Sequence, residues 1–358
     1  MRRGLWLVTV GLIVAASFPV PAQPPYYAGK TIEILVPFPA GGGTDIETRV
    51  FVPFLERHIA GNPRVVVRNM PGGGSILGAK WYAQNAKPDG LQLLASSGST
   101  VTPFLLGVAQ VRYDFSKWKL VKVNGVGGVV YVSPRTGIKK AEDFLKPAQR
   151  LVYGGISATG LDLATLLLFE VLGMDVRAVL GLEGRGPARL TFERGETNID
   201  YQTTPAYLTQ VAPLVKEGKA IPIMSMGFVN ERGQMVRDPA APDLPTPYEV
   251  FELLHKRKPD GLLSWKAYQS MVSATSSFQK ALWVPEGTPA EALPALHEAI
   301  DRMNRDPQFG VQSQKVLEGY AIFRGDQAEA AVHRSMSLTP DAKKFMTDLL
   351  RDKYNVRL

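Results

Sequence analysis

Apolar stretches alternate with amphipathic ones through the first third of the chain. Residues 30–38 (KTIEILVPF) and 64–70 (RVVVRNM) have the composition of buried strands. Each is followed by a glycine-rich turn and then by apolar residues at helical spacing, through about residue 59 and over about 76–85. A further strand is predicted at 91–97 (LQLLASS). Strands that alternate with helices predict an α/β fold with a parallel sheet, whose ligands bind at the carboxyl ends of the strands.

The glycine-rich turns stand where such a ligand would lie. They read PAGGGTD at 39–45 and PGGGS at 71–75, and a polar turn, GST, follows the third strand at 98–100. Glycine lets a ligand lie against the backbone, and the next helix offers free N–H groups and the positive end of its dipole. Thr44 is expected to cap its helix, and Asp45 suits the first turn. The alternative is that the glycines only form tight turns, but their repetition favours a carboxylate or phosphate site.

The first 22 residues have the pattern of a secretory signal. Arg2 and Arg3 precede an apolar run over about 4–16, and Val20-Pro21-Ala22 suits a signal peptidase. We therefore expect residues 1–22 to be removed and the mature protein to be periplasmic. An uncleaved membrane anchor is the alternative. The chain has no cysteine, which excludes disulfides, thiol chemistry and a lipid-anchored start.

Composition and charge narrow the class of function. With 358 residues and 45% hydrophobic content, the chain is long enough for two globular domains. Its net charge of +8 is spread along the sequence, and the densest basic stretch, HKRKPDG at 255–261, contains no aromatic residue. This pattern argues against a nucleic-acid partner and is compatible with attraction of small anions to a cleft.

Enzyme motifs are incomplete. The sequence GGSILGAK at 73–80 lacks the Gly-Lys-Ser/Thr order of a phosphate-binding P-loop. In GISATG at 155–160, Thr159 replaces the second glycine of a Gly-x-Ser-x-Gly nucleophile turn. The four histidines have no metal-ligand spacing. We expect no enzymatic activity, catalytic residue, metal or cofactor, although a triad assembled from distant residues remains an alternative.

Several motifs together resemble one known family. The stretches ILVPFPAGGGTD, VVRNMPGGGSILGA and KPDGLQLLASSGST, all within residues 27–103, resemble the periplasmic solute-binding receptors of tripartite tricarboxylate transporters, the TctC/Bug family. The resemblance continues through YDFSKWKLV, RLVYGGISATG, GLEGRGPARLTFERGETNIDY, APDLPTP and ALWVPEGTPAEAL. It covers nearly the whole chain after the predicted signal peptide.

The resemblance implies a two-lobed periplasmic-binding-protein (Venus flytrap) fold, in which each lobe is a mixed, mostly parallel sheet flanked by helices. The first lobe would comprise residues 26–126 and 228–358, with helices near its end packed back on it, and the second lobe 127–227. The expected function is capture of a small mono-, di- or tricarboxylate by a monomeric receptor that delivers it to a membrane permease. The alternative is a receptor that presents the same liganded form to a sensor kinase.

The resemblance also implies the residues of the site. In the family, backbone N–H groups of the two glycine loops hold one carboxylate, the aspartate of the first loop acts through water, and the second lobe contributes the turn at 155–160 and the segment before Pro205. Together with the polar turn at 98–100, the candidate ligand-binding residues are Pro39, Ala40, Gly41, Gly42, Gly43, Thr44, Asp45, Gly72, Gly73, Gly74, Ser75, Gly98, Ser99, Thr100, Ser157, Ala158, Thr159, Thr203 and Thr204.

Three features depart from the family pattern. Asp162 follows the second-lobe turn where many members carry a histidine. We expect Asp162 to start a helix and point away from the cleft; otherwise the ligand is not a simple dicarboxylate. Arg185 and Arg189 are expected on a solvated helix face, with a salt bridge to the ligand as the alternative. Residues 230–280 form a longer connection than usual, with two amphipathic helices. We expect a loosely packed surface insertion, and the alternatives are that these helices decorate the hinge side or contact a partner.

Overall fold

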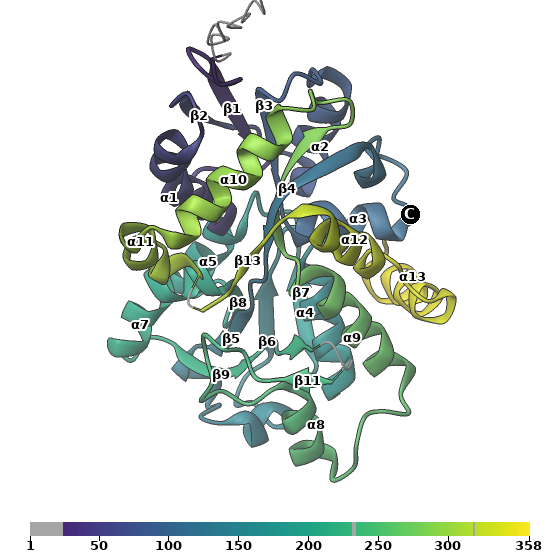
Figure 1. Ribbon diagram of the computed structural model, residues 1–358. Helices are drawn as coiled ribbons and strands as arrows, with labels where there is room; N and C mark the ends of the chain where they lie inside the picture. The colour runs from purple at the N-terminus through teal and green to yellow at the C-terminus, as the bar shows by residue number, and fades with distance from the viewer. Residues whose placement is uncertain (1–23, 231–233, 318) are drawn as a thin grey trace, which may run out of the picture.

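The computed structural model describes residues 24–230, 234–317 and 319–358, so the predicted signal peptide lies outside the described residues. The chain forms two lobes, each built on a twisted sheet with helices around it (Figure 1). Among the described residues, no helix combines the length and apolar character that crossing a bilayer requires.

The first lobe contains a six-stranded sheet in the order β13-β4-β12-β3-β1-β2. β1 is parallel to β2 and β3, whereas β12 is antiparallel to both β3 and β4. Its strands are β1 (Thr31–Val36), β2 (Arg64–Asn69), β3 (Gln92–Ser96), β4 (Trp118–Asn124), β12 (Lys280–Pro285) and β13 (Ile322–Phe323). Its helices are α1 (Gly43–His58), α2 (Ile76–Asn85), α3 (Gly98–Leu106), α10 (Ala292–Arg305), α11 (Pro307–Leu317) and α12 (Gly325–Ser335).

Alternation along β1 explains how this sheet is covered on both faces. Ile34 and Val36 point into one buried cluster with α1 and α10, while Leu35 points into another with α2 and α3. Successive side chains of a strand face opposite sides, so a strand that ends in consecutive apolar residues, as β1 does at Ile34, Leu35 and Val36, needs helices on both. The sequence KTIEILVPF therefore specifies the central position of β1.

The second lobe contains a five-stranded sheet in the order β7-β6-β8-β5-β9. β6 is parallel to β7 and β8, and β5 is antiparallel to β8 and β9. Its strands are β5 (Gly128–Val132), β6 (Leu151–Gly154), β7 (Val176–Val179), β8 (Ile199–Thr203) and β9 (Ile221–Ser225). Its helices are α4 (Asp162–Leu172), α5 (Arg185–Glu193), α6 (Thr204–Ala206), α7 (Ala212–Lys216) and α8 (Pro247–His255).

Short segments complete the described chain. β10 and β11 pair antiparallel beyond β9. The short elements are β10 (Phe228–Val229), β11 (Met235–Val236), a π-helical turn (Tyr207–Val211) and 3₁₀ turns at Gly73–Ser75, Phe115–Lys117, Pro134–Thr136 and Ala141–Leu145.

The predicted insertion is not loosely packed. Helix α9 (Leu263–Thr275) buries Trp265, Tyr268 and Met271, which belong to one core cluster with residues of α4 and α13 (Pro340–Tyr354). Figure 1 shows α9 and α13 on the same side of the molecule, with α9 beside α4. The expectation of a surface insertion is therefore wrong, because the apolar face of α9 is long enough to form a core. The last helix, α13, likewise packs on α9 and not against the first sheet.

Two local predictions near the glycine loops also change. The N-cap of α1 is Gly42, with no side-chain cap, so Thr44 lies inside the first turn and does not cap the helix. Residues 98–100 are not a turn but the start of α3, where Ser97 and Thr100 form a reciprocal capping box. Asp45 lies in the first turn of α1, as predicted.

Candidate functional site

A cleft lies between the lobes at the carboxyl ends of β1 and β3. Its walls are Phe38, Pro39, Ala40, Gly42, Gly43, Thr44, Ser97, Ser99, Gln279 and Lys280 from the first lobe, and Ile156, Leu161, Gly184, Arg185, Gly186, Pro187 and Thr203 from the second. The centre of a water molecule can reach about 50 Å³ of this cleft. This space is large enough for several water molecules or a small solute.

The two lobes touch across this cleft. The backbone N–H of Leu161 donates to Ser99 Oγ at 3.4 Å, and Gln210 Nε2 donates to the Gly41 carbonyl at 3.4 Å. A β-carbon on Gly184 would lie 3.4 Å from the Pro39 ring. The two lobes are thus in direct contact at the edges of the cleft. A ligand bound between them would be shielded from water, and its hydrogen bonds would be stronger there than in solvent.

Two helix N-termini face the cleft, one from each lobe. α1 begins after Gly42 and α5 begins after Gly184, and neither has a side-chain cap. Residues at both starts line the cleft. The first N–H groups of a helix lack internal partners and carry the positive end of its dipole. The cleft is therefore suited to an anion.

A buried charged cluster lies beneath the first-lobe wall. Lys122 Nζ donates to Glu47 Oε1 at 2.7 Å, and Lys280 Nζ lies 3.3 Å from Glu47 Oε2. All three side chains are 3% exposed. Burial opposes the charge of Glu47, but the two lysines outweigh it and hold its pKa below the ordinary value. Burial lowers the pKa of both lysines, against the attraction of Glu47. Two basic side chains share a single carboxylate.

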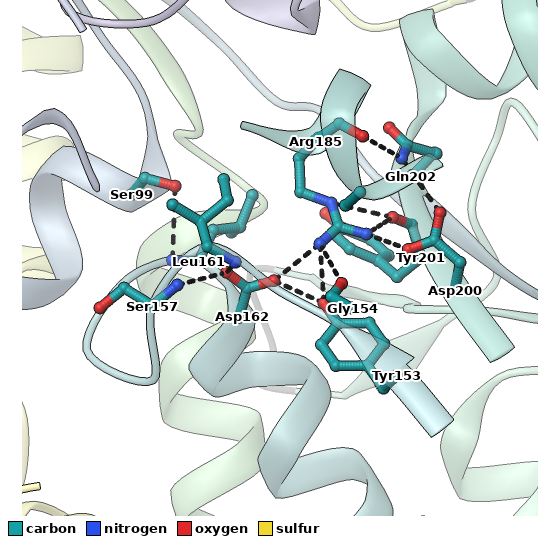
Figure 2. A network of polar contacts seen from close by, with 12 residues as sticks. Ser99, Tyr153, Gly154, Ser157, Leu161, Asp162, Arg185, Asp200, Tyr201 and Gln202 are labelled. Atoms are coloured by element: carbon teal, nitrogen blue, oxygen red, sulfur yellow. Dashed lines mark hydrogen bonds and ion pairs between the residues drawn. The ribbon is translucent and has the colours of Figure 1, made fainter. Parts of the chain in front are cut away.

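Asp162 organises the second-lobe turn. Its Oδ2 accepts the backbone N–H groups of Ile156 and Ser157 at 2.9 and 3.2 Å. Its Oδ1 accepts the Tyr153 hydroxyl at 2.5 Å and Arg185 Nη1 at 2.9 Å. The carboxylate is the first residue of α4, is buried, and points toward Arg185 (Figure 2). The prediction that Asp162 starts a helix and points away from the cleft is confirmed.

Arg185 is not on a solvated helix face, so that expectation is wrong. Its guanidinium is buried and forms ion pairs with Asp162 and Asp200 (Figure 2). Burial opposes the charge of Arg185, but the surrounding acidic and tyrosine groups outweigh it and raise its pKa. Burial raises the pKa of Asp200, against the attraction of Arg185. The guanidinium therefore holds β6, α4 and β8 together. Arg189 contacts Gln210 and Glu193.

The predicted site residues fall into three groups. Seven line the inter-lobe cleft: Pro39, Ala40, Gly42, Gly43, Thr44, Ser99 and Thr203. Five line a neighbouring cavity of about 590 Å³: Gly72, Gly73, Gly74, Ser157 and Thr159. The other seven line neither: Gly41, Asp45, Ser75, Gly98, Thr100, Ala158 and Thr204. Ile156 lines both cavities, and the two glycine loops line different ones.

Asp45 has a supporting position. Its carboxylate accepts Gly41 N–H at 2.9 Å, Arg49 Nε at 3.0 Å and Asn69 Nδ2 at 2.9 Å. Burial alone would raise the pKa of Asp45, but these hydrogen bonds outweigh burial and lower it. The side chain is buried and is not part of the cleft wall. Asp45 fixes the shape of the first glycine loop through Gly41.

Sequence reasoning missed the contribution of three segments. Phe38 and Ser97 end two predicted strands, Gly184, Gly186 and Pro187 lie at the start of α5, and Gln279 and Lys280 lie where β12 begins. The Gly-Arg-Gly-Pro run was a usable signal, because glycine followed by proline is common where a helix begins. Gln279 and Lys280 carry no local pattern that distinguishes them.

The described residues contain no group of three or more metal-ligating side chains placed to hold an ion. His58 lies 2.8 Å from an Asp306 oxygen, and His255 and His297 lie 3.1 and 2.8 Å from backbone carbonyl oxygens. These three histidines make structural contacts.

Solved structures share this architecture. The periplasmic binding protein BugD superposes with a TM-score of 0.68 at 20% identity, covering 89% of this chain and 97% of that one. MatC of Rhodopseudomonas palustris, solved with bound malate, gives 0.66 at 20% identity, covering 89% and 99%. A second R. palustris protein, solved with adipate, gives 0.63 at 19%, covering 86% and 95%. The fold is that of two-lobed periplasmic binding proteins.

Curated proteins of similar sequence include Bug and UPF0065 proteins. BugT of Bordetella pertussis is 29% identical over 216 residues, which is 57% of this chain and 64% of that protein, just under two thirds of its length. A UPF0065 protein from the gbd 5′ region of Cupriavidus necator is 27% identical over 355 residues, 94% of this chain and 96% of that protein. No family model matches the chain. The chain is therefore similar to Bug and UPF0065 proteins in sequence and shares its fold with periplasmic binding proteins.

Proposed function

We propose that this protein captures a small organic carboxylate between its lobes in the periplasm, as a monomer, and delivers it to the permease of a tripartite tricarboxylate transporter. The observation that carries the proposal is the convergence of two uncapped helix N-termini, those of α1 and α5, on one inter-lobe cleft. Backbone N–H groups at Gly43 and Thr44 and hydroxyls of Ser99 and Thr203 are the proposed donors.

The chemistry of the cleft supports an anionic ligand that leaves unchanged. Neutral N–H donors bind a carboxylate strongly when water is excluded, yet they release it when the lobes separate. Roughly six hydrogen bonds of somewhat more than 1 kcal/mol each correspond to micromolar affinity. Relatives of the same fold were solved with malate and with adipate, and these acids are the first candidates for this cleft.

Thermal denaturation with an organic-acid panel tests the binding step. The purified mature protein is heated with L-malate, adipate, citrate or nicotinate, and with the uncharged amides of the same acids. A ligand that binds only the folded state raises the melting temperature, by several degrees when its concentration is about 100 times Kd. We expect at least one acid to stabilise the protein and its amide to have no effect. Equal effects of acid and amide would contradict the anion site.

Uptake experiments test the delivery step. We expect cells that lack this protein to lose uptake of the stabilising acid, and to recover it only when the protein and both membrane subunits of the permease are present. Normal uptake, combined with loss of an acid-induced transcriptional response, would instead support presentation to a sensor kinase.

A further inference from the structure

Gln279 is a buried side chain with unmet hydrogen-bonding capacity at the cleft. It is 1% exposed and lines the cleft at the start of β12. Burial raises the pKa of the Tyr201 hydroxyl, and the nearby Gln279 amide opposes this effect. Yet neither Nε2 nor Oε1 of Gln279 has a hydrogen-bond partner of ordinary geometry within the described part of the chain. A buried amide without partners is destabilising, so a polar group in the cleft would complete its bonding.

Lys280, the next residue, has an unbalanced charge. Its Nζ donates to the Gly43 carbonyl at 2.6 Å, and it shares Glu47 with Lys122. Its ammonium therefore lies at the positive end of α1, where a cation is disfavoured. Lys122 is positioned differently, because its Nζ contacts Glu47 and Asn124 and it does not line the inter-lobe cleft. One carboxylate balances one of the two lysines, and an anion in the cleft would balance the other.

We propose that Gln279 and Lys280 form a direct subsite for the ligand carboxylate, with the Lys280 ammonium as its counter-ion and Gln279 Nε2 as a donor. This inference rests on the proposed function and deepens it, since it adds a fixed cation to a site otherwise built from neutral donors. Lys280 is the first residue of β12, the strand that returns the chain to the first sheet, and Gln279 directly precedes it. The subsite therefore selects a negatively charged ligand. A neutral analogue would bind more weakly, because it would leave the Lys280 ammonium without a counter-ion.

Matched lysine variants test the subsite. Lys280→Met and Lys122→Met each remove one positive charge from the same buried cluster, but only Lys280 lines the cleft. Titration calorimetry uses whichever of L-malate, adipate, citrate and nicotinate stabilises the wild type most. We expect Lys280→Met to lose about 10- to 100-fold in affinity, as for a hydrogen bond to a charged group, and Lys122→Met to lose less than about threefold. Gln279→Leu should lose about 3- to 10-fold. Circular dichroism and melting curves confirm that each variant folds.

The outcomes separate this inference from the proposed function. An equal loss of affinity in both lysine variants would mean that the buried cluster acts only through its long-range positive charge. This result would overturn direct contact between Lys280 and the ligand. Unchanged affinity in Lys280→Met and Gln279→Leu would overturn the subsite while leaving carboxylate capture intact. Failure of the wild type to bind any acid of the panel would overturn both.

Discussion

The α-carbon of Gly43, the first residue of α1, faces the Thr203 side chain of the opposite lobe so closely that a β-carbon on Gly43 would lie 2.6 Å from Thr203 Oγ1. Real β-carbons do not approach another heavy atom this closely. Glycine is therefore required at position 43 by the other lobe and not by the backbone, whose conformation there is helical.

Gly43→Ala should weaken ligand binding without weakening the fold. Alanine favours a helix more than glycine does, so the melting temperature should stay the same or rise. Because the methyl group prevents the lobes from meeting, affinity for the stabilising acid should fall at least about tenfold, roughly 1.4 kcal/mol. Gly310→Ala in α11 is the control, since a β-carbon there would meet nothing within 4 Å and the residue does not line the cleft. Calorimetry that gave both variants the same affinity would contradict this role of Gly43.

Arg185→Met should be strongly destabilising. The change leaves Asp162 and Asp200 buried without their shared cation. Breaking a buried ion pair from one side costs about 3–5 kcal/mol. Arg189→Met is the matched control four residues along α5, because its partner Glu193 is about one-third exposed and its loss should cost less than about 1 kcal/mol. Urea denaturation measures both, and similar midpoints would refute a structural role specific to Arg185.

Asp162→Asn tests whether the Asp162 carboxylate only stabilises the second-lobe turn or also repels an anionic ligand. Asparagine has one carbonyl oxygen to replace two, so the bonds from Ile156, Ser157 and Arg185 cannot all persist. We expect a loss of about 1–3 kcal/mol in the free energy of unfolding and no gain in affinity for a dicarboxylate such as malate. Tighter malate binding would show instead that the Asp162 charge reaches the cleft.

Asp45 should make stability depend on acid pH. The folded-state pKa of Asp45 lies below its ordinary value of 3.8. The folded protein therefore binds fewer protons there than the unfolded chain, and the stabilisation by the charged form is complete above that ordinary value. It is lost as pH falls through the folded-state pKa. Unfolding of wild type and Asp45→Asn, compared between about pH 7 and pH 2.5, should show a stability difference that is constant above about pH 5 and shrinks below pH 4. A constant difference throughout would contradict the lowered pKa.

Local sequence patterns predicted the parts of the site that depend only on neighbouring residues in the chain. The strands before each glycine loop and the helices after them follow from apolar periodicity and from the absence of side chains at 41–43 and 72–74. The orientation of Asp162 also follows from its place at a helix start.

The remaining features depend on contacts distant in sequence. Arg185 is buried because Asp162 and Asp200, 23 and 15 residues away, reach it from other elements. Lys280 meets Gly43 across 237 residues. Ile156, from the second lobe, lines the cavities of both glycine loops. No periodicity or spacing encodes such contacts, so the sequence identified much of the first-lobe wall of the cleft but, of the second-lobe wall, only Thr203.

The packing of α13 on α9 sets an order for folding. The sheet of the second lobe is complete at Ser225, but its core also needs Met346 and Leu350, within the last 13 residues of the chain. Until those residues are available, the apolar faces of α4 and α9 lack a partner. A chain truncated before residue 340 would expose these faces and associate with other truncated chains.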